Sequence, residues 1–371
     1  MMLRFFLLLM LALNGCVIQA SDDRCAVATW PDWATFQQMM LSEQGRVIDA
    51  SDPRQITTSE GQSYAMFFAL VNNEPLLFRR LVRWTEDHLA QGDLTAHLPA
   101  WLWGQKPDHT WGVLDSNTAS DSNLWIAYTL LEAGRLWGQR SYSVLGHLIL
   151  KRMAQEEVLD IPGFGYVLMP GQFGFSGEHS WRLNPSYVPP QLLARIAQEQ
   201  PIHPWAELLE NTPRFLLETS PLGLAPDWVT RTQKDWSYQR ADEKVGSYDA
   251  IRVYLWIGML HPDSLHSSAL KTHFKQGLLA LQPQRLPAEK ISILQGSAEG
   301  MGPPGFSAAL LPLLNDTPSA ALQRQRVQDT PMHTLGYYNQ ALVLFGQGWD
   351  DKRYFFDQHG YLVPAWVDCN E

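Results

Sequence analysis

The chain has 371 residues, with 28 Lys and Arg against 38 Asp and Glu, which gives a formal net charge of −10. This excess of negative charge argues against binding to nucleic acid or to an anionic membrane surface. The 15 Trp, 12 Tyr and 15 Phe are more informative, because flat rings with a polar edge can grip the C–H faces of sugar rings, although most of them are expected to fill the core.

The first twenty residues are predicted to be an export signal rather than part of the fold. Arg4 precedes an apolar run over 5–13, which is too short to span a bilayer but has the length of a signal-peptide core. Cleavage after Ala20 predicts a periplasmic or secreted protein. The alternative is a lipoprotein, because residues 13–16 resemble a processing site in which Cys16 would be acylated and anchor the protein to a membrane.

Two cysteines remain after such a cleavage, Cys25 and Cys369, at the two ends of the mature chain. An oxidising compartment favours a disulfide between them, and compact domains often bring their termini together. Two free thiols are the alternative.

Residues 21–371 are predicted to form a single domain, because no linker, charge run or low-complexity tract divides them. Helical periodicity dominates this stretch. Helices are expected at 61–72, 74–90, 121–137, 142–157, 188–198, 204–218, 247–259, 264–281, 305–314, 318–328 and 337–346. One β-hairpin is expected over 164–175, with Pro170-Gly171 as its turn, and the longest loop over 282–304, as part of a binding surface.

Eleven successive helices without a Rossmann or P-loop motif predict an all-α fold in which helical hairpins pack around a common centre. An (α/α)6 barrel with long loops forming a substrate groove accommodates eleven or twelve helices. No internal sequence repeat marks the six-fold arrangement, which rests on the number of helices alone.

Three carboxylates stand beside small and aromatic residues in segments far apart: Glu60, Asp121 and Asp249. Hydrolysis of a sugar polymer needs a proton donor and a proton acceptor on opposite sides of one bond, which two of these residues could supply. Each also has a structural alternative. Thr57 and Glu60 match a helix capping box, Asp121 could cap the helix over 122–137, and Asp249 could form a simple ion pair with Arg252.

The surroundings of two carboxylates favour different roles. Gly61 leaves space beside Glu60, and the apolar residues 64–67 would desolvate its carboxyl group and raise its pKa, as a general acid requires. An acid paired with Arg252 would keep a low pKa, so Asp249 would remain an ionised base at neutral pH.

Several motifs together resemble glycoside hydrolase family 8, and within it the periplasmic endo-β-1,4-glucanases encoded beside bacterial cellulose synthases. The resemblance covers nearly the whole mature chain. It rests on Ser59-Glu60-Gly61-Gln62-Ser63-Tyr64, residues 98–104, Ala119-Ser120-Asp121 with the positions that follow to Trp137, Asn184-Pro185-Ser186-Tyr187, Ser247-Tyr248-Asp249-Ala250-Ile251-Arg252 and residues 345–349.

This resemblance implies an (α/α)6 barrel and an inverting mechanism, with Glu60 as general acid and Asp249 as general base. It also implies that Asp121 holds and distorts the sugar at the cleavage point. The chain departs from the family pattern at Ser122, where Gly or Ala is preferred, and at Asn123, which replaces a second Asp. The change at Asn123 puts a secondary contact in doubt rather than the reaction.

The candidate sugar-binding rings are Trp101, Trp103, Tyr187, Tyr248 and Tyr337, with core packing as the alternative for each. Arg252 is expected to orient Asp249 or the attacking water. No metal or other cofactor is expected, because the eleven His residues are scattered and no His-Glu-x-x-His or Cys-x-x-Cys motif occurs.

The sequence thus predicts a secreted endo-β-1,4-glucanase that trims nascent cellulose, with β-1,4-glucan as substrate and the cellulose synthase export complex as a candidate partner. Two alternatives stay open: a related hydrolase of xylan, chitosan or mixed-linkage glucan, and a non-catalytic glucan-binding component of the export machinery.

Overall fold

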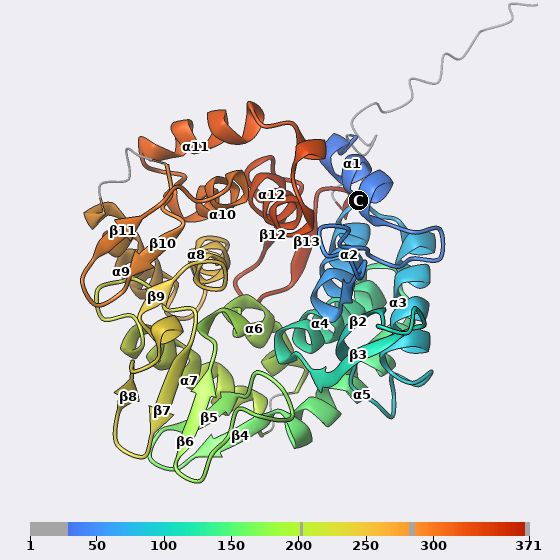
Figure 1. Ribbon diagram of the computed structural model, residues 1–371, viewed down its shortest axis with the longest axis horizontal. Helices are drawn as coiled ribbons and strands as arrows, with labels where there is room; N and C mark the ends of the chain where they lie inside the picture. The colour runs from blue at the N-terminus through green and yellow to red at the C-terminus, as the bar shows by residue number, and fades with distance from the viewer. Residues whose placement is uncertain (1–28, 201–202, 282–285, 368–371) are drawn as a thin grey trace, which may run out of the picture.

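The computed structural model describes residues 29–200, 203–281 and 286–367. In these ranges the chain forms twelve α-helices and thirteen short β-strands, and the helices form two concentric rings around one axis (Figure 1). The predicted signal segment 1–20, Cys16 and the predicted Cys25–Cys369 disulfide lie outside the described residues.

The inner ring consists of the even-numbered helices, and most residues of each are buried, because the outer ring covers one side and the other inner helices cover the rest. These helices are α2 (Ser59–Val71), α4 (Ser120–Leu136), α6 (Pro190–Glu199), α8 (Ala250–Gly258), α10 (Pro304–Leu314) and α12 (Tyr337–Asp350).

The outer ring consists of helices in which fewer than half of the residues are buried. They are α1 (Pro31–Met40), α3 (Pro75–Leu89), α5 (Arg140–Glu156), α7 (Trp205–Glu218), α9 (Ser267–Ala280) and α11 (Ser319–Gln328). The predicted (α/α)6 barrel is therefore confirmed. No helix among the described residues is long and apolar enough to cross a membrane.

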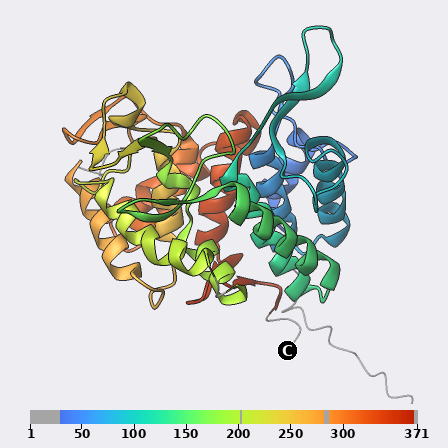
Figure 2. The same cartoon turned by 90° about the horizontal axis from the view of Figure 1, so that it is seen from below.

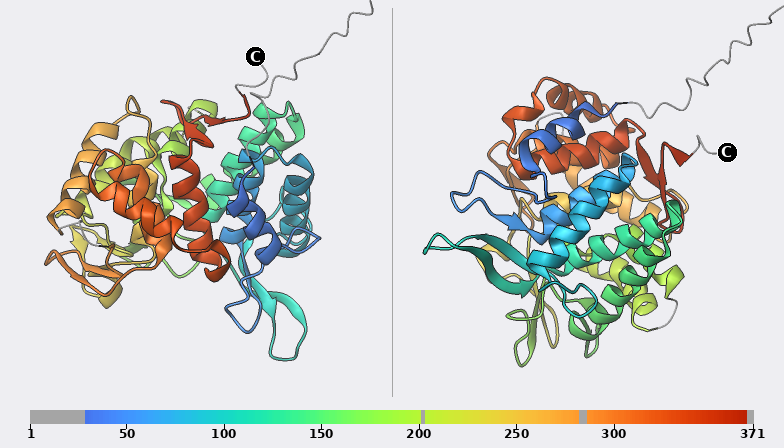
Figure 3. Two further views of the ribbon diagram at one scale, coloured as in Figure 1. Left: turned by 90° about the horizontal axis from the view of Figure 1, so that it is seen from above. Right: turned by 90° about the vertical axis from the view of Figure 1, so that its right-hand side faces the viewer.

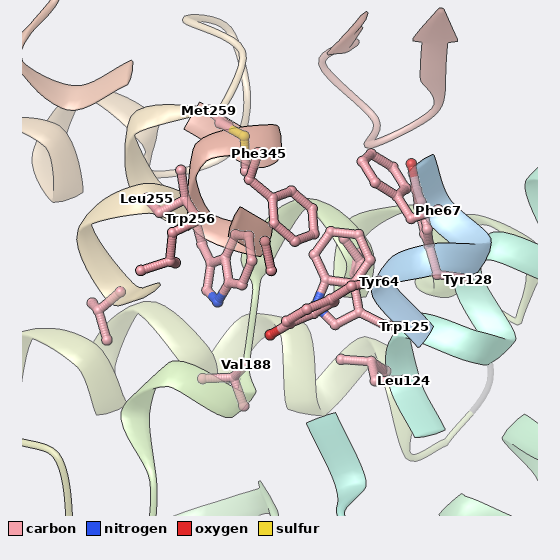
Figure 4. Close-up of a cluster of buried hydrophobic side chains, with 14 of the residues drawn as sticks. Tyr64, Phe67, Leu124, Trp125, Tyr128, Val188, Leu255, Trp256, Met259 and Phe345 are labelled. Carbon is pink, nitrogen blue, oxygen red and sulfur yellow. The ribbon is translucent and has the colours of Figure 1, made fainter. Parts of the chain in front are cut away.

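Aromatic rings from several inner helices meet at the centre of the barrel (Figure 4). Phe345 of α12 lies 4.9 Å from Tyr64 of α2 and 5.2 Å from Trp125 of α4, and Trp125 lies 5.2 Å from Trp256 of α8, all measured between ring centroids. Edge-to-face and tilted pairs at these separations stabilise the core beyond the area they bury. Tyr64 lies one turn after Glu60, so this cluster supports the helix that carries the predicted acid.

The eleven predicted helices all exist, with ends within four residues of those expected. The first outer helix, α1, is missing from the prediction. Its buried residues are Trp33, Phe36 and Met40, and Pro31 occupies its first turn. That spacing and the N-terminal Pro were readable signals for a helix.

Five small sheets connect the helices, with orders β1-β2-β3, β4-β5, β6-β7-β8, β11-β10-β9 and β12-β13. The strands are β1 (Thr57–Thr58), β2 (Ala100–Gln105), β3 (Trp111–Thr118), β4 (Val158–Ile161), β5 (Gly165–Leu168), β6 (Ser180–Leu183), β7 (Val229–Thr232), β8 (Trp236–Ser237), β9 (Val245–Gly246), β10 (Lys290–Ser292), β11 (Ser297–Glu299), β12 (Tyr354–Phe356) and β13 (Leu362–Pro364). The sequence therefore underestimated the number of strands.

The predicted hairpin over 164–175 is wrong in its pairing. Strand β5 pairs with the preceding strand β4, and the turn between them contains Gly163 at φ 76°, a conformation that glycine adopts without strain. The segment after β5 instead contacts the end of β3, where the Phe173 N–H donates to Asn117 Oδ1 over 3.1 Å.

The predicted loop 282–304 also differs from expectation, because its described part, 286–304, contains β10 and β11. Residue Ile291 of β10 pairs with Gly246 of β9, so this segment flanks the approach to Asp249.

Inner and outer helices alternate along the chain, so the six inner helices all begin at the same end of the barrel. Contacts among their N-terminal residues confirm this, for example the Gly305 N–H of α10 donating to Asn339 Oδ1 of α12 over 3.2 Å. The β2–β3 hairpin projects from this end, and β12 and β13 lie at the opposite end (Figures 2 and 3). Helix N-termini carry partial positive charge, which favours carboxylates at that end.

Candidate active site

Arg252, in the first turn of α8, lies at the centre of the carboxylate cluster. Its Nη1 donates to Glu60 Oε2 over 2.7 Å, and its Nη2 donates to Asp249 Oδ1 over 2.7 Å and to Ser186 Oγ over 3.0 Å. Asp121 Oδ2 lies 3.9 Å from the same Nη2. The structure therefore brings together the three carboxylates that the sequence singled out, each from the start of a different inner helix.

Glu60 is the second residue of α2 and takes no part in capping that helix. The cap is Thr58, whose Oγ1 accepts the Gly61 N–H over 3.0 Å. The hydroxyl of Thr57 donates instead to the Val47 carbonyl over 2.6 Å, so the alternative of a Thr57–Glu60 capping box is wrong. The Glu60 carboxylate faces the site, where Tyr337 Oη donates to its Oε1 over 3.0 Å.

Asp121 is likewise not the cap of α4. The helix begins at Ser120, its N-cap position is Ala119, and no side chain caps it. Asp121 Oδ1 accepts the N–H of its neighbour Ser122 over 2.7 Å, while Oδ2 faces Arg252. The carboxylate is buried and held in one orientation.

Asp249 does form the predicted ion pair with Arg252, but within a cluster of three carboxylates around one cation. The side chains of Asp249 and Glu60 are 28% and 20% exposed, whereas those of Asp121 and Arg252 are 4% and 5% exposed. Two carboxylates are therefore reachable from solvent, and two groups are buried behind them.

Burial dominates the electrostatics of this cluster. It raises the pKa of Glu60, while the Arg252 charge and the hydrogen bond from Tyr337 oppose the shift. Burial likewise raises the pKa of Asp121 to about 7, against the opposing effect of Arg252. One guanidinium faces three carboxylates, and the upward pKa shifts of Glu60 and Asp121 favour a bound proton on this pair of carboxyl groups near neutral pH. Such a site offers a proton donor and a proton acceptor together.

A sequence model described as "Glycosyl hydrolases family 8" matches residues 10–352. The chain belongs to glycosyl hydrolase family 8. It is 50% identical to an endoglucanase of Salmonella typhi over 342 residues, 92% of each chain, and 47% identical to an endoglucanase of Escherichia coli O157:H7 over 366 residues, 98% of this chain and 97% of that one. The crystal structure of an endo-1,4-D-glucanase from Vibrio fischeri ES114 matches with a TM-score of 0.87 at 46% identity, covering 91% of this chain and all of that one.

The aromatic residues that the sequence proposed for this family 8 site differ in their placement. Tyr337 is buried, and its hydroxyl holds Glu60 rather than presenting a ring face. Tyr187 is half-buried, with its ring 5.9 Å from the Arg252 guanidinium. Tyr248 is 43% exposed and lies beside Phe306, with ring centroids 5.1 Å apart.

The two tryptophans of β2 behave differently from each other. Trp103 is 9% exposed and packs with Trp84 and Leu89 in a small hydrophobic cluster, so core packing describes it better than sugar binding. Its outer face stacks on Trp111, with ring centroids 5.3 Å apart. Trp101 is half-buried.

Three residues near the site were missed by the sequence reasoning. Tyr338 donates its hydroxyl to the Tyr248 carbonyl, and its ring lies 5.9 Å from the Arg252 guanidinium. Trp228 lies parallel to Phe175 at 5.8 Å, and Asp227 binds the backbone in front of α8. The Asp-Trp pair in an irregular segment was the available signal for the last two.

Asn123, the departure from the family pattern, is fully buried, and its side-chain amide contacts Glu157. Its Nδ2 donates to Glu157 Oε1 over 2.9 Å, and Thr118 Oγ1 donates to the same atom over 2.5 Å. Burial raises the pKa of Glu157 to about 8. The amide at position 123 can donate to Glu157 Oε1, whereas an ionised Asp at this position could only accept.

No group of three or more His, Cys, Asp and Glu side chains in the described part of the chain is arranged to hold a metal ion.

Proposed function

We propose that the protein is an endo-β-1,4-glucanase that cleaves cellulose chains internally with inversion, using Glu60 as general acid and Asp249 as general base. The observation that carries this proposal is the guanidinium of Arg252 between Glu60 and Asp249, 2.7 Å from each. The endoglucanases of Salmonella typhi and Escherichia coli, about half identical over almost the whole chain, support the choice of substrate.

Glu60 is suited to donate a proton to the glycosidic oxygen of the leaving sugar. Burial favours its protonated form, and Tyr337 and Arg252 fix the positions of its two oxygens. Departure of an unprotonated sugar would leave an alkoxide, so a positioned acid accelerates this step. Entry of a sugar excludes water from the site and raises the pKa of Glu60 further.

Asp249 is suited to take a proton from the attacking water. Arg252 lies between its carboxylate and that of Glu60, and in an inverting pair the separation of the two carboxyl groups accommodates a water on the face of the sugar opposite the leaving oxygen. As the water oxygen bonds to the anomeric carbon, its proton passes to Asp249 and the bond to the leaving oxygen breaks. Asp121, buried beside Arg252, would hold the sugar at the point of cleavage.

The stereochemistry of the first product tests this pair of roles. An inverting pair of carboxyl groups stands roughly 6.5–9.5 Å apart and releases the new reducing end as the α-anomer. Proton NMR during early cellopentaose hydrolysis detects the anomer before mutarotation mixes the two forms. An initial β-anomer signal would rule out inversion and the role of Asp249.

The substrate class is tested by comparing carboxymethyl-cellulose, lichenan, xylan and chitosan under one set of conditions. We expect the highest kcat/KM on the β-1,4-glucan. Faster hydrolysis of xylan or chitosan would favour a hydrolase of another glycan, and binding without turnover on all four would favour a non-catalytic component.

We also propose that the enzyme works in the periplasm, where it trims nascent cellulose beside the cellulose synthase export complex. The apolar run over 5–13 and the processing positions after it support export. Mass spectrometry of the mature protein tests the location, since a chain starting at Ser21 is expected and an acylated Cys16 would indicate a membrane anchor. Co-purification with the synthase tests the partner.

A further inference from the structure

Helix α8 begins in an unusual way for a helix preceded by an aspartate. Asp249 occupies its N-cap position with φ −81° and ψ −50°, and its side chain makes no capping hydrogen bond. An Asp at this position ordinarily uses its carboxylate to accept an N–H of the first helical turn. If Asp249 did so, its carboxylate would turn toward the helix and away from Arg252.

Asp227 supplies the missing acceptor from a segment 22 residues earlier in the chain. Its Oδ1 accepts the backbone N–H groups of Ser247 over 2.8 Å, Asp249 over 3.1 Å and Ala250 over 2.8 Å. Its Oδ2 accepts the Ser247 hydroxyl over 2.5 Å. The backbone N–H of Asp227 also donates to the Val245 carbonyl over 2.8 Å. Asp227 is therefore both a donor and an acceptor toward the segment that precedes α8.

The Asp227 carboxylate accepts these hydrogen bonds in the protein interior. Asp227 is 8% exposed, and a buried carboxylate that accepts several hydrogen bonds is fixed in position. Trp228, the next residue, lies beside Tyr187 with ring centroids 6.1 Å apart, so the segment also borders the candidate sugar-binding face.

We propose that Asp227 is a positioning residue that takes over the capping of α8 and thereby leaves the Asp249 carboxylate free to face Arg252 and the attacking water. This inference rests on the proposed role of Asp249 as the base. The observed partners of the Asp227 carboxylate are the backbone N–H groups before and at the start of α8 and the Ser247 hydroxyl. Asp227 acts by fixing the backbone at Ser247, Asp249 and Ala250.

The test compares kcat and KM on cellopentaose for Asp227→Ala and Asp227→Asn. The Ala variant removes both acceptors, and we expect kcat to fall about 10- to 100-fold, as a displacement near 1 Å can produce, with KM within about twofold. The Asn variant keeps Oδ1 for the three N–H groups, so we expect it to restore kcat to within about fivefold of the parent. Unchanged kcat in Asp227→Ala, or an equal loss in both variants, would overturn the proposal.

A matched control separates positioning from general stability. Asp357 accepts the N–H groups of His359 over 2.8 Å and Tyr361 over 2.9 Å in the turn between β12 and β13, at the other end of the barrel. Asp357→Ala also removes a carboxylate that accepts backbone N–H groups, and we expect a lower Tm with unchanged kcat. If Asp227→Ala does not fold, Asp227→Glu keeps the charge but shifts it by one methylene, and the same loss of kcat at constant KM is expected.

A double-variant cycle distinguishes failure of this inference from failure of the proposed function. If Asp249→Asn retains full activity, the assignment of the base is wrong. If Asp249→Asn is inactive as expected, adding Asp227→Ala should lower its residual rate by less than about twofold, because the group being positioned is already disabled. A further loss as large as that in the parent enzyme would mean that Asp227 acts through the fold alone.

Discussion

The two ends of helix α4 hold opposite arrangements of buried charge. At its start, Asp121 shares Arg252 with Glu60 and Asp249, so one cation faces three carboxylates. Eleven residues along the helix, about 16 Å away at 1.5 Å per residue, the carboxylate of Glu132 faces two guanidinium groups.

Near the C-terminal end of α4, the buried negative charge is fully paired with positive charge. Glu132 is fully buried, its Oε1 accepts from Arg195 Nε over 2.6 Å, and its Oε2 accepts from Arg135 Nη2 over 2.5 Å and from the Leu362 N–H over 2.9 Å. Such a group holds helices and the β12–β13 connection together. At the start of α4, three carboxylates share a single cation. This arrangement is unfavourable for folding, but it favours a protonated carboxyl group whose proton can be transferred. The difference separates a charge cluster that stabilises the fold from one suited to catalysis.

The largest expected effect comes from Glu60→Gln at the site end. We expect kcat on soluble β-glucan to fall about 10²- to 10⁴-fold, because the amide cannot donate the proton that a general acid supplies. The amide oxygen can still accept the hydrogen bond of Arg252, and the amide NH2 can donate to the Tyr337 hydroxyl, so the thermal midpoint should change little. Activity within tenfold of the parent would remove Glu60 from the role of acid.

Glu132→Gln at the far end should have the reverse profile. Removing the charge leaves Arg195, whose side chain is 2% exposed, without its buried partner, and breaking such a pair typically costs about 3–5 kcal/mol. Urea unfolding should show this loss, while kcat per folded molecule stays close to that of the parent. A large loss of kcat with unchanged stability would contradict the separation of the two ends.

Glu157 is an intermediate case, since it is a buried carboxyl that accepts hydrogen bonds from the neutral side chains of Thr118 and Asn123. Its pKa is raised from 4.5 to about 8 by burial, so the stability it contributes is fully present below pH 4.5 and is lost as pH rises through 8. The dependence should be about 1.4 kcal/mol per pH unit between those values. Urea unfolding of the parent and of Glu157→Gln at pH 5, 6, 7 and 8 should show a stability difference that increasingly favours the variant. A constant difference would contradict a neutral Glu157.

The smallest effect is expected from Tyr337→Phe. The Tyr337 hydrogen bond lowers the pKa of Glu60 against the larger effect of burial, so its loss should raise that pKa. The alkaline limb of the pH profile of kcat/KM should then move to higher pH, by no more than about one unit. A move to lower pH would mean that another group controls this limb.

The sequence predicted what local periodicity and composition determine. The eleven helices and the buried face after Glu60 follow from spacing along the chain, and the barrel followed from the number of helices. The partner strand of β5 did not, because the choice between pairing with β4 and contacting Asn117 depends on segments distant in sequence. The sequence also did not predict which threonine caps α2. Thr57 and Thr58 are equally plausible caps until the structure shows that the Thr57 hydroxyl binds the Val47 carbonyl.

The cluster of three carboxylates was anticipated, but its organisation was not. Arg252 was assigned to Asp249 because they lie three residues apart on one helix, whereas its contact with Glu60 spans 192 residues. The contribution of Asp227 was invisible for the same reason, because an acceptor that caps a helix from another segment leaves no local pattern.

The alternation of inner and outer helices also fixes where the described chain enters and leaves the barrel. The Thr29 carbonyl accepts a hydrogen bond from Arg353, which follows the last inner helix, and Trp366 Nε1 donates to the Leu70 carbonyl at the end of α2. Both attachments lie at the end of the barrel away from Glu60 and Asp249. An enzyme attached to a solid support through either end of the described chain would therefore have its active site facing away from the support. A large, insoluble polymer could then still reach the site.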